Sequence, residues 1–200
     1  MSASSSDTFD HIGQGLAVLL TVFIGYLLYD KYAVGNLEMV KSTVDGREYL
    51  VQSLPDKQAA ADLLANIGNN LDTLVHHLER SAPSDPRTVR IVTHFNRDAL
   101  SEGVDSEKYT SYSINKGEKI VFCLRAKNAQ KTLEELNMMM FVAIHELAHI
   151  ATVDVGHTPE FWENFKWLLE DAVNIGIYTK QDFEHKPREY CGMKVQSSVI

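Results

Sequence analysis

The feature that most constrains this chain is a short polar pattern inside an apolar helix. Residues 133–151 are mostly apolar, but His145, Glu146 and His149 interrupt them as His-Glu-x-x-His. Residues four apart lie on one face of a helix, so both imidazoles can reach the same ion. Polar groups buried without partners destabilise a fold, whereas a bound metal satisfies them. The pattern therefore predicts a metal-binding helix, with Glu146 placed beside the metal as a catalytic general base.

A catalytic zinc ion takes three protein ligands and keeps its fourth position open, so a third ligand is needed. The best candidate is His157, which directly precedes the next helix, so that a turn can fold it back over the first. Asp154, Glu160 and Glu163 are competitors, because carboxylates also bind zinc. The predicted Zn²⁺ ligands are His145, His149 and His157.

The hydrophobic patterns of the remaining sequence predict one α+β domain over residues 56–178, with a small sheet, the metal-binding helix and a following helix. Spacing of apolar residues near 3.6 predicts a helix over 56–80. Alternation of β-branched residues predicts a strand over 88–95, and residues 109–125 are expected to form a hairpin. Residues 30–55 are expected to be a connector with at most one strand, and residues 179–200 an irregular polar tail.

Two helix starts are predicted around the site. Thr132 and Glu135 have capping-box spacing before the metal-binding helix. Thr158 is expected to cap a second helix that runs to about Asn174, with Gly176 as its stop. The aromatic residues of this second helix are expected to be core residues rather than substrate contacts; they are Phe161, Trp162, Phe165 and Trp167.

Residues 12–29 carry no charged side chain, and eighteen helical residues span about 27 Å, close to the thickness of a bilayer's hydrocarbon core. We predict a single transmembrane helix in contact with lipid here, after a short tail over residues 1–11. Basic residues flank it only on the C-terminal side, so the following domain is expected on the cytoplasmic side. A cleaved signal peptide and a buried core helix are the alternatives.

Charge and cysteine content limit which partners, and which redox compartment, we expect for this protein. The net charge is −8, which makes nucleic acid an unlikely partner, because nucleic-acid-binding proteins present basic surfaces. The two cysteines, Cys123 and Cys191, are too few for a disulfide scaffold and are expected to be reduced thiols.

The stretch Phe-Val-Ala-Ile-His-Glu-Leu-Ala-His, followed by Gly-His-Thr-Pro-Glu-Phe-Trp, resembles the SprT and WLM group of zincin metallopeptidases. The resemblance covers residues 141–169. It implies His145, His149 and His157 as zinc ligands and Glu146 as the catalytic carboxylate. It also implies that the strand over residues 119–125 borders the substrate cleft, and that relatives occur in large DNA viruses.

These observations favour a membrane-anchored zinc metallopeptidase that hydrolyses peptide bonds in protein or peptide substrates. Tyr178 and Tyr190 are candidate donors to the transition-state oxyanion. The alternative is a membrane-embedded structural or assembly component, such as a virion-membrane or minor capsid protein with protein neighbours, whose metal is structural or vestigial. A secreted zincin with its signal still attached is the third possibility.

Overall fold

The computed structural model describes residues 15–26, 37–104 and 110–200. The chain divides into two compact units, Met1–Asn36 and Leu37–Ile200, and the second holds the sheet and the helices that pack on it. The predicted tail over residues 1–11 lies outside the described residues. The α+β class predicted from the sequence is confirmed.

The predicted membrane anchor is corrected. Of this segment the structure describes residues 15–26, which are helical. Across residues 15–26, 37–104 and 110–200, no helix has both the length and the apolar character that crossing a membrane requires. The prediction of a transmembrane helix over residues 12–29 is therefore wrong, and so is the single-pass membrane localisation that depended on it.

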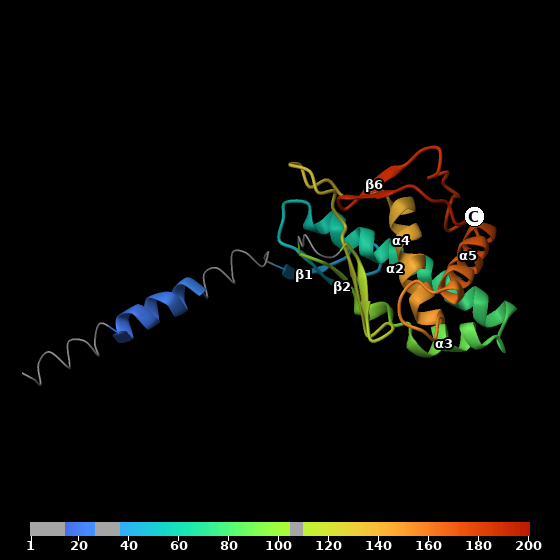
Figure 1. The fold of residues 1–200 in the computed structure, drawn as a ribbon, viewed down its shortest axis with the longest axis horizontal. Coiled ribbons are helices and arrows are strands. Elements are labelled where there is room, and N and C mark those ends of the chain that lie inside the picture. Colours follow the sequence, from blue (N-terminus) through green and yellow to red (C-terminus); the bar gives the residue numbers. More distant parts are fainter. Residues whose placement is uncertain (1–14, 27–36, 105–109) are drawn as a thin grey trace, which may run out of the picture. The chain divides into compact units, whose positions relative to one another are not determined.

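A five-stranded mixed sheet forms one layer of the domain (Figure 1). Its strand order is β1-β2-β3-β5-β4. The two outer pairs, β1–β2 and β5–β4, are antiparallel, whereas β3 is parallel to both of its neighbours. The strands are β1 Leu37–Lys41, β2 Glu48–Gln52, β3 Leu100–Glu102, β4 Tyr112–Ile114 and β5 Lys119–Phe122. Strand β4 is thus an edge of the sheet.

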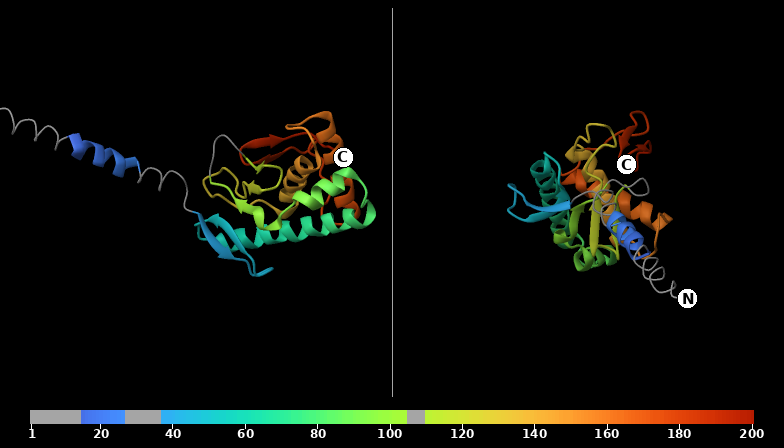
Figure 2. Two further views of the ribbon diagram at one scale, coloured as in Figure 1. Left: turned by 90° about the horizontal axis from the view of Figure 1, so that it is seen from below. Right: turned by 90° about the vertical axis from the view of Figure 1, so that its left-hand side faces the viewer.

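The helices pack on this sheet and on one another around α4. Helix α2 contacts β1, β2 and β3 and runs along one side of the domain (Figure 2), while α4 contacts α2, α3, α5 and strand β4. The bounds are α2 Lys57–Ser81, α3 Pro86–His94, η1 Arg97–Ala99, α4 Leu136–Ala151 and α5 Pro159–Asn174. The predictions of α2 and α5 are confirmed, including the Thr158 cap and the stop at Gly176, which has a φ of 78°.

Residues 37–52 are a hairpin rather than a connector with at most one strand. Strands β1 and β2 pair from Leu37 with Gln52 to Lys41 with Glu48. Asp62, on α2, accepts hydrogen bonds from the hydroxyl of Ser42 and the backbone N–H of Thr43. The hairpin therefore belongs to the domain, and contacts with a helix twenty residues away hold its turn.

Residues 88–95 form most of a helix, α3, and the predicted strand is wrong. The side chain of Asp85 accepts a hydrogen bond from the N–H of Arg87, and Pro86 occupies the first turn. These are strong helix-start signals. Thr88 and Ile91, three residues apart, are the buried residues of α3, so helical packing overrides the β-branched alternation.

Helix α4 begins later than predicted, and the capping box does not form. Glu135 is the N-cap residue but makes no hydrogen bond to the helix with its side chain. The preceding residues are extended instead, because Leu133 pairs with Arg125 and the N–H of Ala126 donates to the carbonyl of Thr132 at 2.9 Å. Pairing with the strand segment therefore replaces the predicted first turn.

Residues 179–200 contain a second, two-stranded sheet and are not an irregular tail. Strands β6, Arg188–Tyr190, and β7, Met193–Val195, are antiparallel. Cys191 and Gly192 form the turn between them, with φ of 48° and 78°. Phe183 and Tyr190 are buried and join the main core. Apolar residues spaced singly among polar ones gave no periodic signal of this hairpin.

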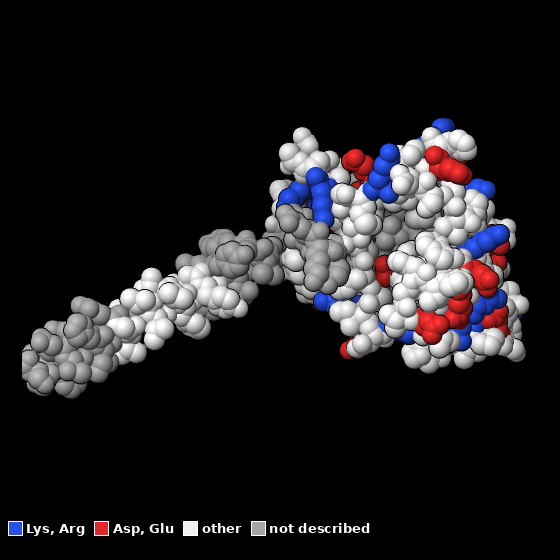
Figure 3. All heavy atoms as spheres, in the orientation of Figure 1, with Lys and Arg blue, Asp and Glu red and all other residues white. Residues whose placement is uncertain are grey.

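Charged side chains of both signs lie on the surface of the domain (Figure 3). On the face shown in Figure 3, acidic and basic side chains are interspersed over the domain. Arg87 pairs with Asp85, and Arg90 lies 3.6 Å from Glu160. At these positions the basic side chains of α3 lie beside acidic partners, one at the N-cap of α3 and one on α5.

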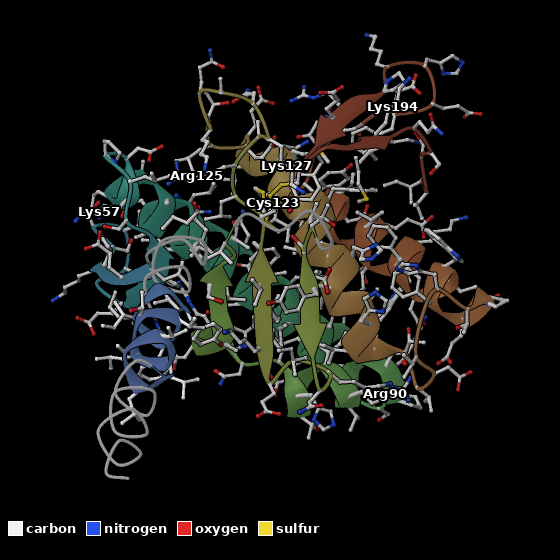
Figure 4. The ribbon with its side chains drawn as sticks, turned by 60° about the vertical axis from the view of Figure 1, so that its left-hand side comes forward. Lys57, Arg90, Cys123, Arg125, Lys127 and Lys194 are labelled. Atoms are coloured by element: carbon white, nitrogen blue, oxygen red, sulfur yellow. A yellow bond between two sulfur atoms is a disulfide. The ribbon has the colours of Figure 1, made fainter. Side chains whose placement is uncertain are left out.

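A disulfide attaches the C-terminal hairpin to the main sheet. Cys191 is bonded to Cys123, which directly follows β5, across a sequence separation of 68 residues (Figure 4). The prediction of two reduced thiols is therefore wrong. The contact depends on the hairpin folding back over the end of β5, and two cysteines so far apart in sequence give no sign of it.

We expect Cys123→Ser, Cys191→Ser or chemical reduction to lower the free energy of unfolding by about 3–4 kcal/mol, because the bond closes a long loop in the unfolded chain. Urea denaturation with and without reductant measures the loss. The double variant should match either single variant, because each removes the same bond. Equal stability of the wild-type chain in both conditions would contradict the prediction.

Candidate functional site

Two of the predicted ligands lie one turn apart on α4, the most buried helix of the domain. Its other faces pack on α2, α3 and α5, and only His145 and His149 among its last ten residues are half-buried rather than buried. The two rings are 5.0 Å apart between centroids. Because the apolar side chains of α4 are buried against the neighbouring helices, the two histidines face a cleft.

The third predicted ligand, His157, joins them from the loop between α4 and α5. Its ring lies 4.9 Å from that of His145 and 5.0 Å from that of His149, and the Nε2 atoms of His157 and His145 are 3.0 Å apart. One nitrogen from each ring lies within 4.8 Å of the others. Nitrogens around a tetrahedral zinc ion, at bonds of about 2.0–2.1 Å, are about 3.3 Å apart, so the cluster has the size to hold a metal ion.

The carboxylate competitors stay outside this cluster. Asp154 lines the cleft on an exposed loop, Glu160 faces Arg90, and Glu163 is exposed on α5. Among the residues that the structure describes, the three histidines are the sole group of three or more potential ligands within metal-binding distance. Of the four candidates for a third ligand, the structure therefore brings His157 to the pair.

Hydrogen bonds between α4 and α5 hold the loop that carries His157. The hydroxyl of Thr152 donates to the carbonyl of Ala148 at 2.7 Å and accepts from the Nδ2 of Asn164, on α5, at 3.0 Å. Both side chains are buried. Gly156, with a φ of 91°, lets the loop turn before Thr158 caps α5. The position of His157 is therefore set by buried polar contacts on both sides of the loop.

Two cations bind the carbonyl end of α4 and support the same loop. Lys116, in the β4–β5 turn, donates from its Nζ to the carbonyls of Thr152 and Val153. Arg90, on α3, donates from its Nε to the carbonyl of Ala151 at 2.6 Å. Positive charge is favourable at the C-terminal end of a helix, where carbonyls lack partners. The sheet and α3 are thereby both tied to the start of the His157 loop.

Glu146 is buried beside the cluster and has an unsatisfied oxygen. Its side chain lines the same cleft, is only 4% exposed, and its Oε2 has no hydrogen-bond partner. Burial raises the pKa of Glu146 to about 7. A buried carboxylate oxygen without a partner is costly unless a ligand or water occupies the space before it. The position therefore suits a group that exchanges protons with something bound in the cleft.

The environment keeps the two helix histidines uncharged at neutral pH. Burial, with smaller contributions from the neighbouring imidazoles, lowers the pKa of His145 to about 3. Burial also lowers the pKa of His149 to about 4, with smaller contributions from His157 and Lys116. Neutral imidazole is the form that binds metal ions, so the donor set fits a metal such as zinc.

The cluster opens into a cleft of about 870 Å³. Its walls are edge strand β4, helices α4 and α5, the His157 loop and the C-terminal hairpin with the residues after it. The expectation that residues 119–125 border the cleft is wrong: β5 is an interior strand, and residues 110–116, around β4, line the cleft instead.

The two candidate oxyanion donors differ in position. Tyr178 is buried against Phe141 and does not line the cleft, and burial raises the pKa of Tyr178 to about 12. Tyr190 does line the cleft, but its hydroxyl donates to the carbonyl of Cys123 at 2.9 Å and lies 2.6 Å from the Oγ of Ser111. Its hydroxyl is thus already engaged in joining the hairpin to the sheet.

Several cleft residues were not expected from the sequence. Trp162 is 44% exposed and lines the cleft, and so does the buried Phe165, although both were predicted to be core only. Phe141 and Val142 also line it, one turn before His145 on α4. Their spacing from His145 was a usable signal, because residues three and four apart share a helix face. The hairpin residues Met193 and Val195 gave no such signal.

Comparisons with known proteins found one family model and several viral relatives. The family model described as WLM domain matches residues 94–199, which include both helices of the site and the C-terminal hairpin. An uncharacterised protein of Acanthamoeba polyphaga mimivirus is 30% identical over 189 residues, which cover 92% of this chain and 95% of the viral protein. No solved structure matches the chain.

Two further relatives are shorter matches from other large DNA viruses. An uncharacterised protein of Invertebrate iridescent virus 6 is 34% identical over 99 residues, 48% of this chain and 53% of that protein. An uncharacterised protein of Invertebrate iridescent virus 3 is 35% identical over 89 residues, 44% of this chain and 52% of that protein. The source of these relatives agrees with the resemblance noted in the sequence.

We expect Asn164→Ala to lower the free energy of unfolding by about 1–3 kcal/mol, because the substitution removes a buried hydrogen bond between α4 and α5. Chemical denaturation followed by circular dichroism measures the change. Asn174→Ala, at an exposed position near the end of α5, is the matched control and should stay within about 0.5 kcal/mol of the wild type. Equal losses in the two variants would show that the Asn164 contact contributes nothing specific.

Proposed function

Because this chain belongs to the WLM domain family, which is associated with metallopeptidase-like activity, we propose that it is a zinc-dependent metallopeptidase. The observation that carries the proposal is the shared cleft, in which three imidazoles converge beside the unpaired Oε2 of Glu146. Peptide hydrolysis needs these two parts together, a metal site and an adjacent base.

His145, His149 and His157 are the residues that would hold zinc. Their donor atoms are imidazole nitrogens, which zinc binds well, and three ligands leave one position open. A bound zinc ion supplies a Lewis acid that polarises the scissile carbonyl and acidifies water. Burial of α4 and the hydrogen bonds of the His157 loop hold the three rings together in the metal-free protein. Less ordering of the side chains is therefore needed when a metal binds.

Glu146 would be the general base. In the proposed reaction its carboxylate accepts a proton from the attacking water and returns it to the amine of the leaving peptide. Its burial restricts the side chain, and its open Oε2 has no competing partner in the protein. Edge strand β4 borders the cleft, so an extended substrate can lie alongside it.

A metal with a purely structural or assembly role would need a different set of ligands. A structural zinc ion has four protein ligands, whereas the described residues bring three to this cluster. A structural site also has no use for a buried carboxylate with an unsatisfied oxygen. Both observations favour the peptidase over the structural alternative.

We expect the full-length wild-type chain to retain about one zinc ion per molecule after dialysis, measured by elemental mass spectrometry. His157→Ala should weaken zinc binding by about 100-fold or more, because loss of a ligand exceeds the about 10–100-fold effect of losing an outer partner. His185→Ala, an exposed histidine outside the cluster, is the control and should keep wild-type affinity. A folded wild-type chain without zinc would refute the site.

We expect Glu146→Gln to keep the zinc ion but to lower peptide hydrolysis by about 10²–10⁴-fold, since the amide cannot accept the proton from water. Turnover of a mixed peptide library, followed by mass spectrometry, measures the loss. Glu170→Gln, an exposed substitution of the same chemistry on α5, should leave turnover unchanged. Turnover by Glu146→Gln within a few-fold of the wild type would remove Glu146 from the mechanism.

A further inference from the structure

We propose that the cleft selects substrates with a large apolar side chain beside the scissile bond, an inference that rests on the proposed function. Its first support is the face of α4 next to the histidines. Phe141 and Val142 precede His145 by four and three residues, so they lie one turn from it on the same face. Both line the cleft that holds the cluster. A substrate side chain that lies against this part of α4 would therefore contact the apolar side chains of Phe141 and Val142.

Two other walls of the cleft, formed by α5 and β7, also present apolar side chains. Phe165 and Trp162 line it from α5, and Met193 and Val195 line it from β7. Met193 is 51% exposed and Trp162 is 44% exposed, although both side chains are large and apolar. Exposed apolar side chains that line one cleft indicate a surface that is covered when a ligand binds.

The cleft has three charged residues among the described ones, and none of them is on α5 or β7. They are Lys116, Glu146 and Asp154. The Nζ of Lys116 is bonded to two loop carbonyls, Glu146 is the buried carboxyl beside the histidines, and Asp154 is on the His157 loop. No charged residue from α5, the C-terminal hairpin or the residues after it lines the cleft in the described part of the chain. A charged substrate side chain placed there would lose hydration without gaining a counter-charge.

The test uses two blocked tripeptide hydroxamates that are identical except for a leucine or an aspartate side chain. Hydroxamates chelate zinc and are not cleaved, so calorimetric titration of the zinc-loaded full-length chain reports binding without turnover. We expect the leucine compound to bind about 10–100-fold more tightly, in the range that apolar pockets discriminate. Equal affinities, or tighter binding of the aspartate compound, would overturn the proposal.

A matched pair of variants locates the preference. Met193→Lys places a cation on the cleft wall and should lower the leucine-to-aspartate affinity ratio at least tenfold. Met39→Lys makes the same change at a methionine of similar exposure, 57%, on β1, away from the cleft, and should leave the ratio unchanged. An unchanged ratio in Met193→Lys would show that the hairpin wall does not select the side chain.

A metal-independent comparison separates this inference from the proposed function. The corresponding peptide amides lack the chelating group, and their binding to the full-length chain is read from the fluorescence of Trp162, with Trp162→Phe as the control. If neither zinc nor hydroxamate binds, the proposed function fails, and a leucine preference among the amides still supports the apolar pocket. A second outcome is that zinc and both hydroxamates bind while the leucine and aspartate compounds have equal affinities, among the hydroxamates and among the amides alike. In that case the pocket inference alone fails.

Discussion

Burial of α4 is the constraint on which the domain depends. An apolar helix packed against α2, α3, α5 and the sheet edge has one face on which polar groups can remain, and His145, His149 and Glu146 occupy that face. The same packing that excludes water from the core therefore aligns two imidazoles and excludes counter-charges from Glu146. The site is a product of the core rather than an addition to its surface.

The third histidine depends on a different kind of contact. His157 is on a loop, so its position comes from the Thr152–Asn164 hydrogen bond and from the two cations at the end of α4. These contacts join the β4–β5 turn, α3 and α5 to one short segment. Stability and site geometry are therefore coupled, because a substitution that loosens any of these elements also moves a candidate ligand.

The sequence predicted the parts of this site that follow helical spacing, and missed those that depend on distant contacts. Periodic apolar patterns correctly predicted α2 and α5. Helical spacing also predicted the histidine pair, and the helix cap that follows His157 was predicted from its residue type. The strand propensity of the residues in α3 gave a wrong prediction, because the Asp85 cap and helix packing determine the structure there. The absence of charge over residues 12–29 resembled a membrane span, but among the described residues no helix is long and apolar enough to cross a membrane. The Cys123–Cys191 bond joins segments that sequence spacing cannot relate.

The position of that disulfide also shows which part of the cleft is synthesised last. The chain emerges from the ribosome with its N-terminal residues first, so β4, α4, His157 and α5 are all made before Cys191. A nascent chain therefore holds the three histidines and Glu146 before the hairpin wall with Met193 and Val195 exists. Pairing of Cys123 must wait until a partner 68 residues further along the chain has been synthesised. One covalent bond thus connects the wall that is made last to a strand that is made before all three candidate ligands.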